Sequence, residues 1–165
     1  YKDALSAIGN KGVSRNYPHT PGIDAAGIIE TSESKNFKVG EEVIVTGYDL
    51  GMNTSGGFSE YIRVPSEWVV KKPEGISLSE SMALGTAGLT AGLCVRKLIN
   101  HKLTPDSGKL FVTGATGGVG IVAMMLLSKL GFEVVAITGK LDSQDMLKEY
   151  GACLLYTSPS PRDNR

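Results

Sequence analysis

Short runs of hydrophobic and β-branched residues, separated by turn residues, dominate the first half of the chain. The runs are rich in Val, Ile and Tyr, and Gly, Pro, Ser and Asn lie between them, as is typical of the strands of a sandwich or barrel. The predicted strands lie within residues 25–32, 41–48, 58–65 and 67–73. The first part of the chain is therefore expected to be a β domain.

The pattern changes near residue 78. Serine residues suited to helix capping precede small and apolar residues at helical spacing, which predicts a helix within residues 77–99. Strands and helices then alternate, in the order strand 109–114, helix 119–131, strand 133–139 and helix 143–151. Such alternation builds a parallel sheet through right-handed crossovers. The predicted fold class is α/β plus β.

Composition and charge exclude several kinds of partner. Seventeen basic residues balance seventeen acidic ones in the 165-residue chain, so nucleic acid and the membrane surface are not expected as partners. Residues 119–127, taken as the longest apolar stretch, are too short to cross a bilayer. The two cysteines cannot form a disulfide framework. A reducing, cytoplasmic location and a small-molecule substrate are expected.

The most informative local motif is the glycine-rich loop at residues 113–120, TGATGGVG, which follows a strand and opens a helix. Backbone amides at a helix N-terminus can hold a pyrophosphate. Gly117, Gly118 and Gly120 would lack the Cβ atoms that keep a ligand away. The alternative is a strand-to-helix turn that binds nothing. Ile121 and Val122 occupy the positions where a phosphate-binding Walker loop needs Lys and then Ser or Thr.

The end of the second strand of this region indicates which dinucleotide would bind. The contact to the adenosine ribose is expected about twenty residues after the glycine loop, where Thr138, Gly139 and Lys140 lie. A hydroxyl, an accessible backbone and a cation favour a 2′-phosphate, and hence NADPH. Asp142 nearby keeps NAD as an alternative, and a solvated loop lysine is the other interpretation of Lys140.

Five motifs in order resemble the medium-chain dehydrogenase/reductase superfamily. They are YPHTPGIDAAGII, FKVGEEVIVTG, GGFSEYIRVP, ALGTAGLTAGLCV and VTGATGGVG, and the opening YKDALSAIGNKG is most similar to the zinc-free quinone-oxidoreductase-like and acrylyl-CoA reductase group. The loop also fits the T-G-x-x-x-G-x-G pattern of short-chain dehydrogenases. Their loop lies near the chain start, however, and their Tyr-x-x-x-Lys pair is absent from this sequence.

The resemblance implies a domain organisation. Residues 1–84 would be a GroES-like β-barrel domain lacking its first strands, and residues 85–152 the first half of a Rossmann-type domain, with the active site between the domains of a homodimer. The segment CLLYTSPSPRD within residues 153–165 resembles a translated sequencing adapter. We therefore expect a non-native, disordered tail there, and a 165-residue chain that is itself inactive and prone to aggregate.

Metal chemistry is not expected. Zinc-dependent relatives place a His–Glu pair after the Pro-Gly of the barrel domain, where this chain has Ile23-Asp24. No cysteine precedes Cys94, and neither histidine has the spacing of a ligand set. Without a Lewis acid, the expected reaction is hydride transfer from NADPH to the activated C=C bond of a small enoyl-CoA such as acrylyl-CoA. An NADPH quinone reductase and a non-catalytic NADPH-binding relative are the alternatives.

The resemblance also implies the roles of individual residues. The predicted catalytic residues are Tyr1, Asp3 and Thr86. Residues expected to bind the cofactor are Tyr1, Thr116, Gly117, Gly118, Val119, Thr138, Gly139 and Lys140. Tyr1 would contact the nicotinamide or substrate and Asp3 would orient that region, while Thr86 would border the nicotinamide.

Overall fold

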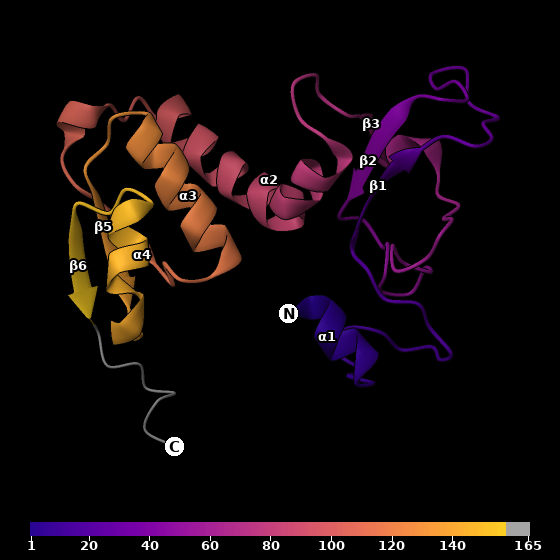
Figure 1. Ribbon diagram of the computed structural model, residues 1–165, viewed down its shortest axis with the longest axis horizontal. Helices are drawn as coiled ribbons and strands as arrows, with labels where there is room; N and C mark the ends of the chain where they lie inside the picture. Colours follow the sequence, from indigo (N-terminus) through magenta and orange to yellow (C-terminus); the bar gives the residue numbers. More distant parts are fainter. Residues whose placement is uncertain (158–165) are drawn as a thin grey trace. The chain divides into compact units, whose positions relative to one another are not determined.

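The structure is a computed structural model that describes residues 1–157. The chain divides into two compact units, the first comprising Tyr1–Thr86 and the second beginning at Ala87 (Figure 1). The first unit holds the antiparallel strands and the second unit the parallel ones.

The first unit is built on a three-stranded antiparallel sheet. Its strands are β1 (Asp24–Ile28), β2 (Glu42–Thr46) and β3 (Val69–Lys71), in the order β1-β2-β3. They confirm three of the predicted strands. A short helix, α1 (Lys2–Ala7), opens the unit and was not predicted, while the 3₁₀ turn η1 (Ser66–Trp68) leads into β3.

The strand predicted within residues 58–65 is wrong. These residues form no ladder with another segment, although Ile62 and Val64 are half-buried between exposed Tyr61 and Arg63. The Ser59 hydroxyl donates to the carbonyl of Tyr61 at 2.7 Å, a local bond that replaces a cross-strand one. The alternation thus matches which side chains are more buried, but it carries no information on whether a partner strand lies beside the segment.

Four glycines hold part of the first unit together by backbone-to-backbone packing. Gly57 N donates to Gly22 O at 2.9 Å, and Gly56 N donates to Thr20 O at 2.7 Å. A Cβ on Gly51 or Gly56 would overlap the carbonyl of Gly22, and one on Gly57 would overlap the carbonyl of Asp24. We call Gly22, Gly51, Gly56 and Gly57 the glycine cluster. Its members allow two loops to approach more closely than side chains permit.

The helix α2 (Leu78–Asn100) begins in the first unit and ends in the second. Its start is a capping box, in which Glu80 N donates to the Ser77 hydroxyl at 3.1 Å and the Glu80 carboxylate accepts from Ser77 N at 2.7 Å. These bonds from the Ser77 backbone and side chain lower the pKa of Glu80 below its ordinary value. The predicted helix is confirmed, but Gly85 interrupts it with φ 47° and ψ −150°.

By length and composition alone, α2 is the one helix within residues 1–157 that could cross a membrane, with a mean hydropathy of 1.3. With 23 residues, α2 is longer than the apolar stretch at residues 119–127, so the expectation that this stretch is the longest is corrected. The interruption at Gly85 leaves residues 86–100 as the longer regular piece. At ~1.5 Å per residue this piece spans about 22 Å, less than the ~30 Å of a hydrocarbon core.

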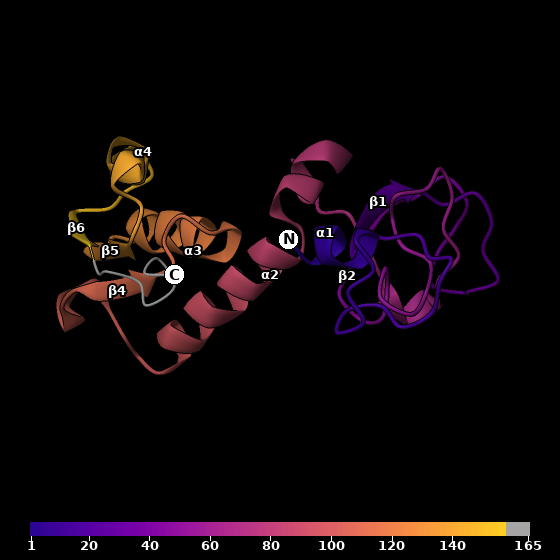
Figure 2. The ribbon, with the colours of Figure 1, turned by 90° about the horizontal axis from the view of Figure 1, so that it is seen from below.

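The second unit confirms the predicted alternation of strands and helices around a parallel sheet (Figure 2). The strands β4, β5 and β6 are parallel and adjacent in that order, with Phe111 paired to Val135 and Val135 to Leu154. The elements are η2 (Pro105–Ser107), β4 (Leu110–Thr113), α3 (Gly118–Lys129), β5 (Val134–Thr138), η3 (Leu141–Ser143), α4 (Gln144–Glu149) and β6 (Leu154–Thr157).

The strand β6 falls inside the segment that the sequence predicted to be a disordered tail. For Leu154–Thr157 that expectation is wrong, because these residues pair in register with β5. Cys153 N donates to Val134 O at 2.9 Å and fixes the start of the pairing. An apolar segment beside an open strand edge gains backbone hydrogen bonds along the side that faces that edge. Residues 158–165 lie outside the described residues, and the foreign origin of the segment stays a prediction.

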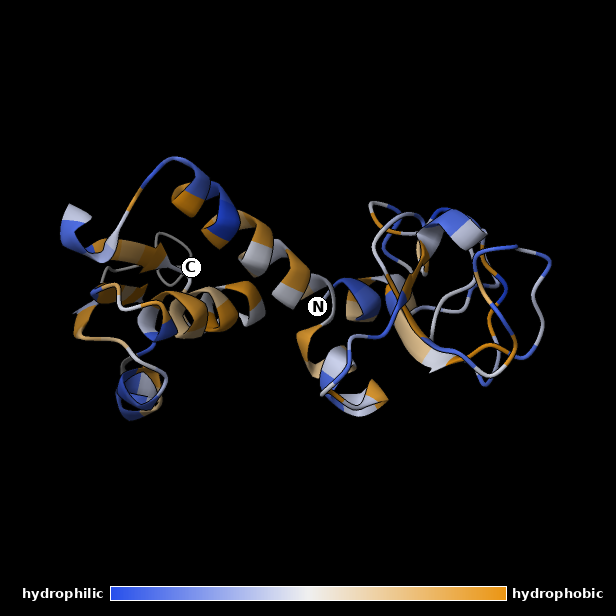
Figure 3. Cartoon of the chain, turned by 90° about the horizontal axis from the view of Figure 1, so that it is seen from above, coloured by the Kyte–Doolittle hydropathy of each residue, from blue (hydrophilic) through white to orange (hydrophobic). Residues whose placement is uncertain are grey.

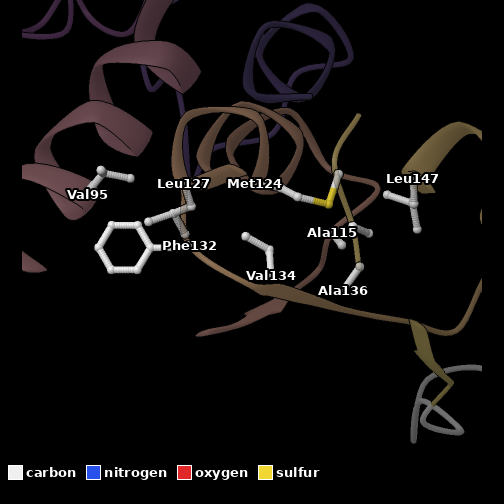
Figure 4. Close-up of a cluster of buried hydrophobic side chains, with 9 residues drawn as sticks. Val95, Ala115, Met124, Leu127, Phe132, Val134, Ala136 and Leu147 are labelled. Carbon is white, nitrogen blue, oxygen red and sulfur yellow. The ribbon is translucent and has the colours of Figure 1, made fainter. Parts of the chain in front are cut away.

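One apolar cluster forms the core of the second unit. Val134 and Ala136 of β5 pack with Met124 and Leu127 of α3 and with Leu147 of α4 (Figure 4). Most of α3 is hydrophobic (Figure 3), as expected of a helix that packs on a sheet. The opposite face of the sheet exposes Phe111, Leu154 and Tyr156, at 64%, 49% and 61%.

Candidate functional site

The glycine-rich loop connects β4 to α3 in a shape that exposes backbone amides. Gly114 follows β4 with φ 60°, a conformation that favours glycine, and its carbonyl accepts from Gly117 N at 2.8 Å. Gly117 is the N-cap of α3 and offers no side-chain acceptor to the helix. The amides of the first helical turn therefore remain available to an external acceptor.

The glycines of this loop have different roles. A Cβ on Gly120 would overlap Gly114 O and lie 2.9 Å from Ala115 Cα, so Gly120 is required by the packing of the loop itself. This corrects the expectation that Gly120 clears space for a ligand. Gly117 and Gly118 are both exposed, and a Cβ on them would meet only Gly114 O at 3.2 Å and Ala87 Cβ at 3.4 Å. Gly117 and Gly118 alone keep the expected role of leaving space for a ligand, because both are exposed to solvent.

The loop after β5 lies at the same edge of the sheet. Ala115 N donates to Ile137 O at 3.3 Å, so the two loops leave neighbouring parallel strands side by side. Thr138 is 5% exposed, and its hydroxyl accepts from Lys140 N at 3.1 Å. The Thr138 side chain thus shapes the turn, while Gly139 and Lys140 are exposed.

The structure therefore brings the two predicted cofactor segments together. Residues 116–119 and 138–140 occupy adjacent loops at the carboxyl edge of the parallel sheet, where α/β proteins bind ligands. The four ion pairs found within residues 1–157 do not involve Lys140. Its ammonium group is thus available to an anion at this edge.

A second group of polar contacts lies within the first unit. The Asp3 carboxylate accepts from Gly22 N at 3.1 Å and from Ile23 N at 2.9 Å, which joins α1 to the loop before β1. Asp3 thus anchors the N-terminal helix.

Asp24, the next residue along, fixes the interruption in α2. Its Oδ1 atom accepts from Thr86 N at 2.9 Å and from the Thr86 hydroxyl at 2.7 Å. A Cβ on Gly85 would lie 2.7 Å from the other carboxylate oxygen, so the carboxylate fits against a residue without a side chain. Sequence reasoning did not assign a role to Asp24. The available signal was a carboxylate directly after the Pro-Gly-Ile segment.

The predicted catalytic residues are only partly brought together. Asp3 and Thr86 are linked through residues 22–24 by the bonds just described. The Tyr1 side chain is 98% exposed, and its carbonyl accepts from Leu5 N at 3.0 Å as α1 begins. Tyr1 lies beside Asp3 in sequence, but its ring takes no part in that network.

Two expectations about cysteine and metal can be compared with the structure. Cys94 lies among apolar neighbours in the sequence of α2, which predicts a buried hydrophobic residue, but the structure leaves it exposed. Within residues 1–157, no group of three or more His, Cys, Asp and Glu side chains is arranged to hold a metal ion.

Comparison with known proteins identifies the first unit. Residues 1–74 match the family described as the alcohol dehydrogenase GroES-like domain. The chain is 46% identical over 152 residues to acrylyl-CoA reductase AcuI of Ruegeria pomeroyi, which covers 92% of this chain and 46% of the relative.

Two further proteins match by sequence and structure. YhfP of Bacillus subtilis, named as a candidate quinone oxidoreductase, is 47% identical over 92% of this chain and 46% of the relative. Its structure with bound NAD has a TM-score of 0.91, over 95% of this chain and 48% of that one. The yhdH oxidoreductase of Salmonella enterica, solved with NADP, is 43% identical with a TM-score of 0.93, over 99% and 49% of the two chains.

The chain spans about half the length of the curated relatives it matches. The likeness runs through both units, since these alignments cover more than nine-tenths of the chain. The predicted architecture, a GroES-like domain followed by part of a Rossmann-type parallel sheet, is confirmed. The chain belongs to the medium-chain dehydrogenase/reductase superfamily, in the group of quinone-oxidoreductase-like and acrylyl-CoA reductase proteins.

Proposed function

We propose that the whole protein is an NADPH-dependent oxidoreductase that reduces the activated C=C bond of a small enoyl-CoA without a metal. The main support is the edge of the parallel sheet, where exposed helix amides and the exposed Lys140 lie in adjacent loops. Bound NADPH would supply the hydride. The relatives differ in the dinucleotide described with them, NADP in one case and NAD in another.

The residues of the second unit fit a phosphorylated dinucleotide. Thr116, Gly117, Gly118 and Val119 would hold the pyrophosphate, because the amides of Gly118 and Val119 in the first turn of α3 have no acceptor within the helix and the helix dipole favours an anion there. The Gly117 amide is already bonded to Gly114 O, so Gly117 would contribute by lacking a side chain. The absence of acidic residues from this turn supports the same assignment. Gly139 and Lys140 would receive the 2′-phosphate, and the buried Thr138 hydroxyl would hold that turn in place.

The first unit would supply the contacts to the substrate. Tyr1 presents an exposed phenol that can donate to a thioester carbonyl as negative charge develops on its oxygen. Asp3 would hold the Tyr1 end of α1 against the loop at residues 22–23. The Thr86 hydroxyl is directed by Asp24 and would border the nicotinamide.

Asp24 supports a reaction without metal. It occupies the position at which zinc-dependent relatives carry the Glu of their His–Glu pair. Its Oδ1 atom already accepts two hydrogen bonds from Thr86, so the carboxylate serves as a structural acceptor. Hydrogen-bond donors, rather than a Lewis acid, would then stabilise the enolate.

The assignment of the cofactor is tested by substituting Lys140→Ala. Loss of a charge-assisted hydrogen bond to the 2′-phosphate is expected to weaken NADPH binding about tenfold or more, and to leave NADH binding unchanged. The measurement is calorimetric titration of the full-length protein with each dinucleotide. Lys129→Ala, at the other end of α3, is the matched control and should change neither affinity. Equal losses for both dinucleotides would contradict the assignment.

A quinone reductase with the same cofactor is the second candidate, because relatives of nearly equal identity carry the two names. The full-length protein should be assayed with acrylyl-CoA and with a small quinone. A CoA-linked enzyme is expected to have a far higher kcat/KM for the thioester. NADPH binding without turnover of either would favour a non-catalytic relative. In this proposal the whole protein is a cytoplasmic homodimer, and the 165-residue chain is inactive by itself.

A further inference from the structure

Tyr48 has a backbone conformation that residues with side chains rarely adopt. Its φ is 54°, and the preceding Gly47 has φ 78°. Within residues 1–157, Lys102 is the only other non-glycine residue with positive φ. Left-handed backbone at a non-glycine residue is unfavourable and is concentrated at functional positions. A glycine would fit this turn better, so the side chain of Tyr48 calls for an explanation.

The Tyr48 ring is fixed and yet exposed. It stacks on Trp68 with 5.3 Å between the ring centroids and 8° between the ring planes. Its hydroxyl donates to Glu67 O at 3.1 Å. The side chain is nevertheless 63% exposed, so packing is not its main role. An aromatic ring that is held in place and open to solvent is preorganised for stacking with a ligand.

Tyr48 also lies at the end of the sheet that carries the polar network. Thr46, the last residue of β2, pairs with Asp24, the first residue of β1. Gly51, three residues beyond Tyr48, packs against Gly22 in the glycine cluster. The loop that begins with Gly47 and Tyr48 therefore belongs to the same region of the first unit as Asp24 and Thr86.

We propose that Tyr48, supported by Trp68, is a stacking platform for a planar conjugated ring of the substrate. This inference rests on the proposed function, which offers two such rings, the adenine of a CoA thioester and a quinone. Stacking on an electron-rich phenol does not depend on a particular pattern of hydrogen bonds, so it suits either ring. The platform would make Tyr48 a residue that contributes to substrate affinity and not to hydride transfer.

Trp68 provides the measurement, because it is the single tryptophan of the chain. Its fluorescence is followed while the 165-residue chain is titrated with coenzyme A, with 4′-phosphopantetheine, which lacks adenine, and with a small benzoquinone. Saturable quenching by coenzyme A but not by phosphopantetheine assigns the contact to the 3′-phosphoadenosine half of coenzyme A, whose planar ring is adenine. Saturable quenching by the quinone alone identifies the quinone. Quenching by neither, or quenching that stays linear with concentration, overturns the proposal.

Tyr48→Gly is the decisive variant, because glycine accepts φ 54° and the fold is expected to be kept. The apparent Kd for the ring-bearing ligand should rise at least tenfold, with an unchanged circular dichroism spectrum. Tyr48→Phe keeps the ring and should bind within threefold of the original chain. Tyr61→Ala removes another tyrosine, 72% exposed and outside the two ring contacts found in residues 1–157, and should have no effect. An unchanged Kd in Tyr48→Gly overturns the proposal.

The NADPH titration separates this inference from the function on which it rests. NADPH binding that depends on Lys140, together with no saturable quenching by either ring, would reject the platform and leave the reductase proposal in place. Quenching that depends on Tyr48, without any NADPH binding, would retain the platform and reject the reductase.

Discussion

The two units of this chain are stabilised in different ways. Among its described residues, 87–157, the second unit buries eleven hydrophobic residues, nine of them in one cluster around β5, α3 and α4. The first unit buries only two hydrophobic residues, Val45 and Leu50, and a hollow of about 1200 Å³ that is open to solvent lies beside β1 and residues 57–66. What holds the first unit is the glycine cluster, together with the acceptors Asp3 and Asp24.

The two units therefore differ in the interactions that stabilise the fold and hold the site residues in position. The second unit has a conventional apolar core, and its loops at the sheet edge rest on that core. The first unit depends on hydrogen bonds and close backbone contacts between segments far apart in sequence, which contribute less apolar burial. Substitutions should therefore act by different mechanisms in the two units.

The largest effect is expected in the core of the second unit. Met124 is fully buried, and Met124→Ala should lower the free energy of unfolding of that unit by about 2–5 kcal/mol through loss of apolar contact and creation of a cavity. Urea unfolding followed by far-UV circular dichroism measures the loss. Met125→Ala, at a position that is 46% exposed, is the control. Similar losses for both variants would mean that the cluster around β5 is not the main source of stability.

A glycine of the first unit should give the next largest effect. In Gly57→Ala the new methyl group would overlap the Asp24 carbonyl, and backbone cannot move aside as a side chain can. We expect a loss of about 1–3 kcal/mol, seen in the unfolding transition of Trp68 fluorescence. The matched control is Gly27→Ala, because a Cβ on Gly27 in β1 meets nothing within 4 Å. If the two variants unfold alike, close backbone packing does not stabilise the first unit.

Asp24→Ala should remove the acceptor for both donors of Thr86. The loss of these two hydrogen bonds is expected to cost about 1–3 kcal/mol locally. Amide hydrogen exchange at Thr86 measures this cost, and exchange should become faster. Asp24→Asn retains an acceptor oxygen and should preserve most of the protection. Unchanged exchange in Asp24→Ala would show that the carboxylate does not fix this part of α2.

The smallest effect concerns the surface pair of Glu41 and Lys71, whose charged atoms lie 2.8 Å apart. The Lys71 ammonium group, followed by the Lys38 amide, lowers the pKa of Glu41 below its ordinary 4.5. Ionised Glu41 therefore adds stability above pH 4.5, and this stability is lost as the pH falls through the lowered pKa. Lys71→Met should raise the pKa of Glu41 in an NMR titration, whereas exposed Lys35→Met should not.

Local patterns predicted most elements but not their long-range contacts. The alternation in residues 42–46 and the glycine-rich turn before α3 are local signals, and both were interpreted correctly. Residues 58–65 share the alternation without a partner strand, because pairing is decided by another segment. The bond between Asp24 and Thr86 joins residues 62 positions apart, and no periodicity records such a contact. The interruption at Gly85 depends on that contact and was missed for the same reason.

The glycine cluster also limits how this protein can change during evolution. In an apolar core, an enlarged side chain can be offset by a smaller one opposite it. Gly51, Gly56 and Gly57 face carbonyl groups of residues 21–24. A backbone carbonyl is the same whatever amino acid carries it, so no substitution at residues 21–24 makes it smaller. A local second-site suppressor would have no side chain to shorten, so compensation beside the substituted glycine is not expected. Saturation mutagenesis should therefore find these positions intolerant as a set, whatever residues surround them.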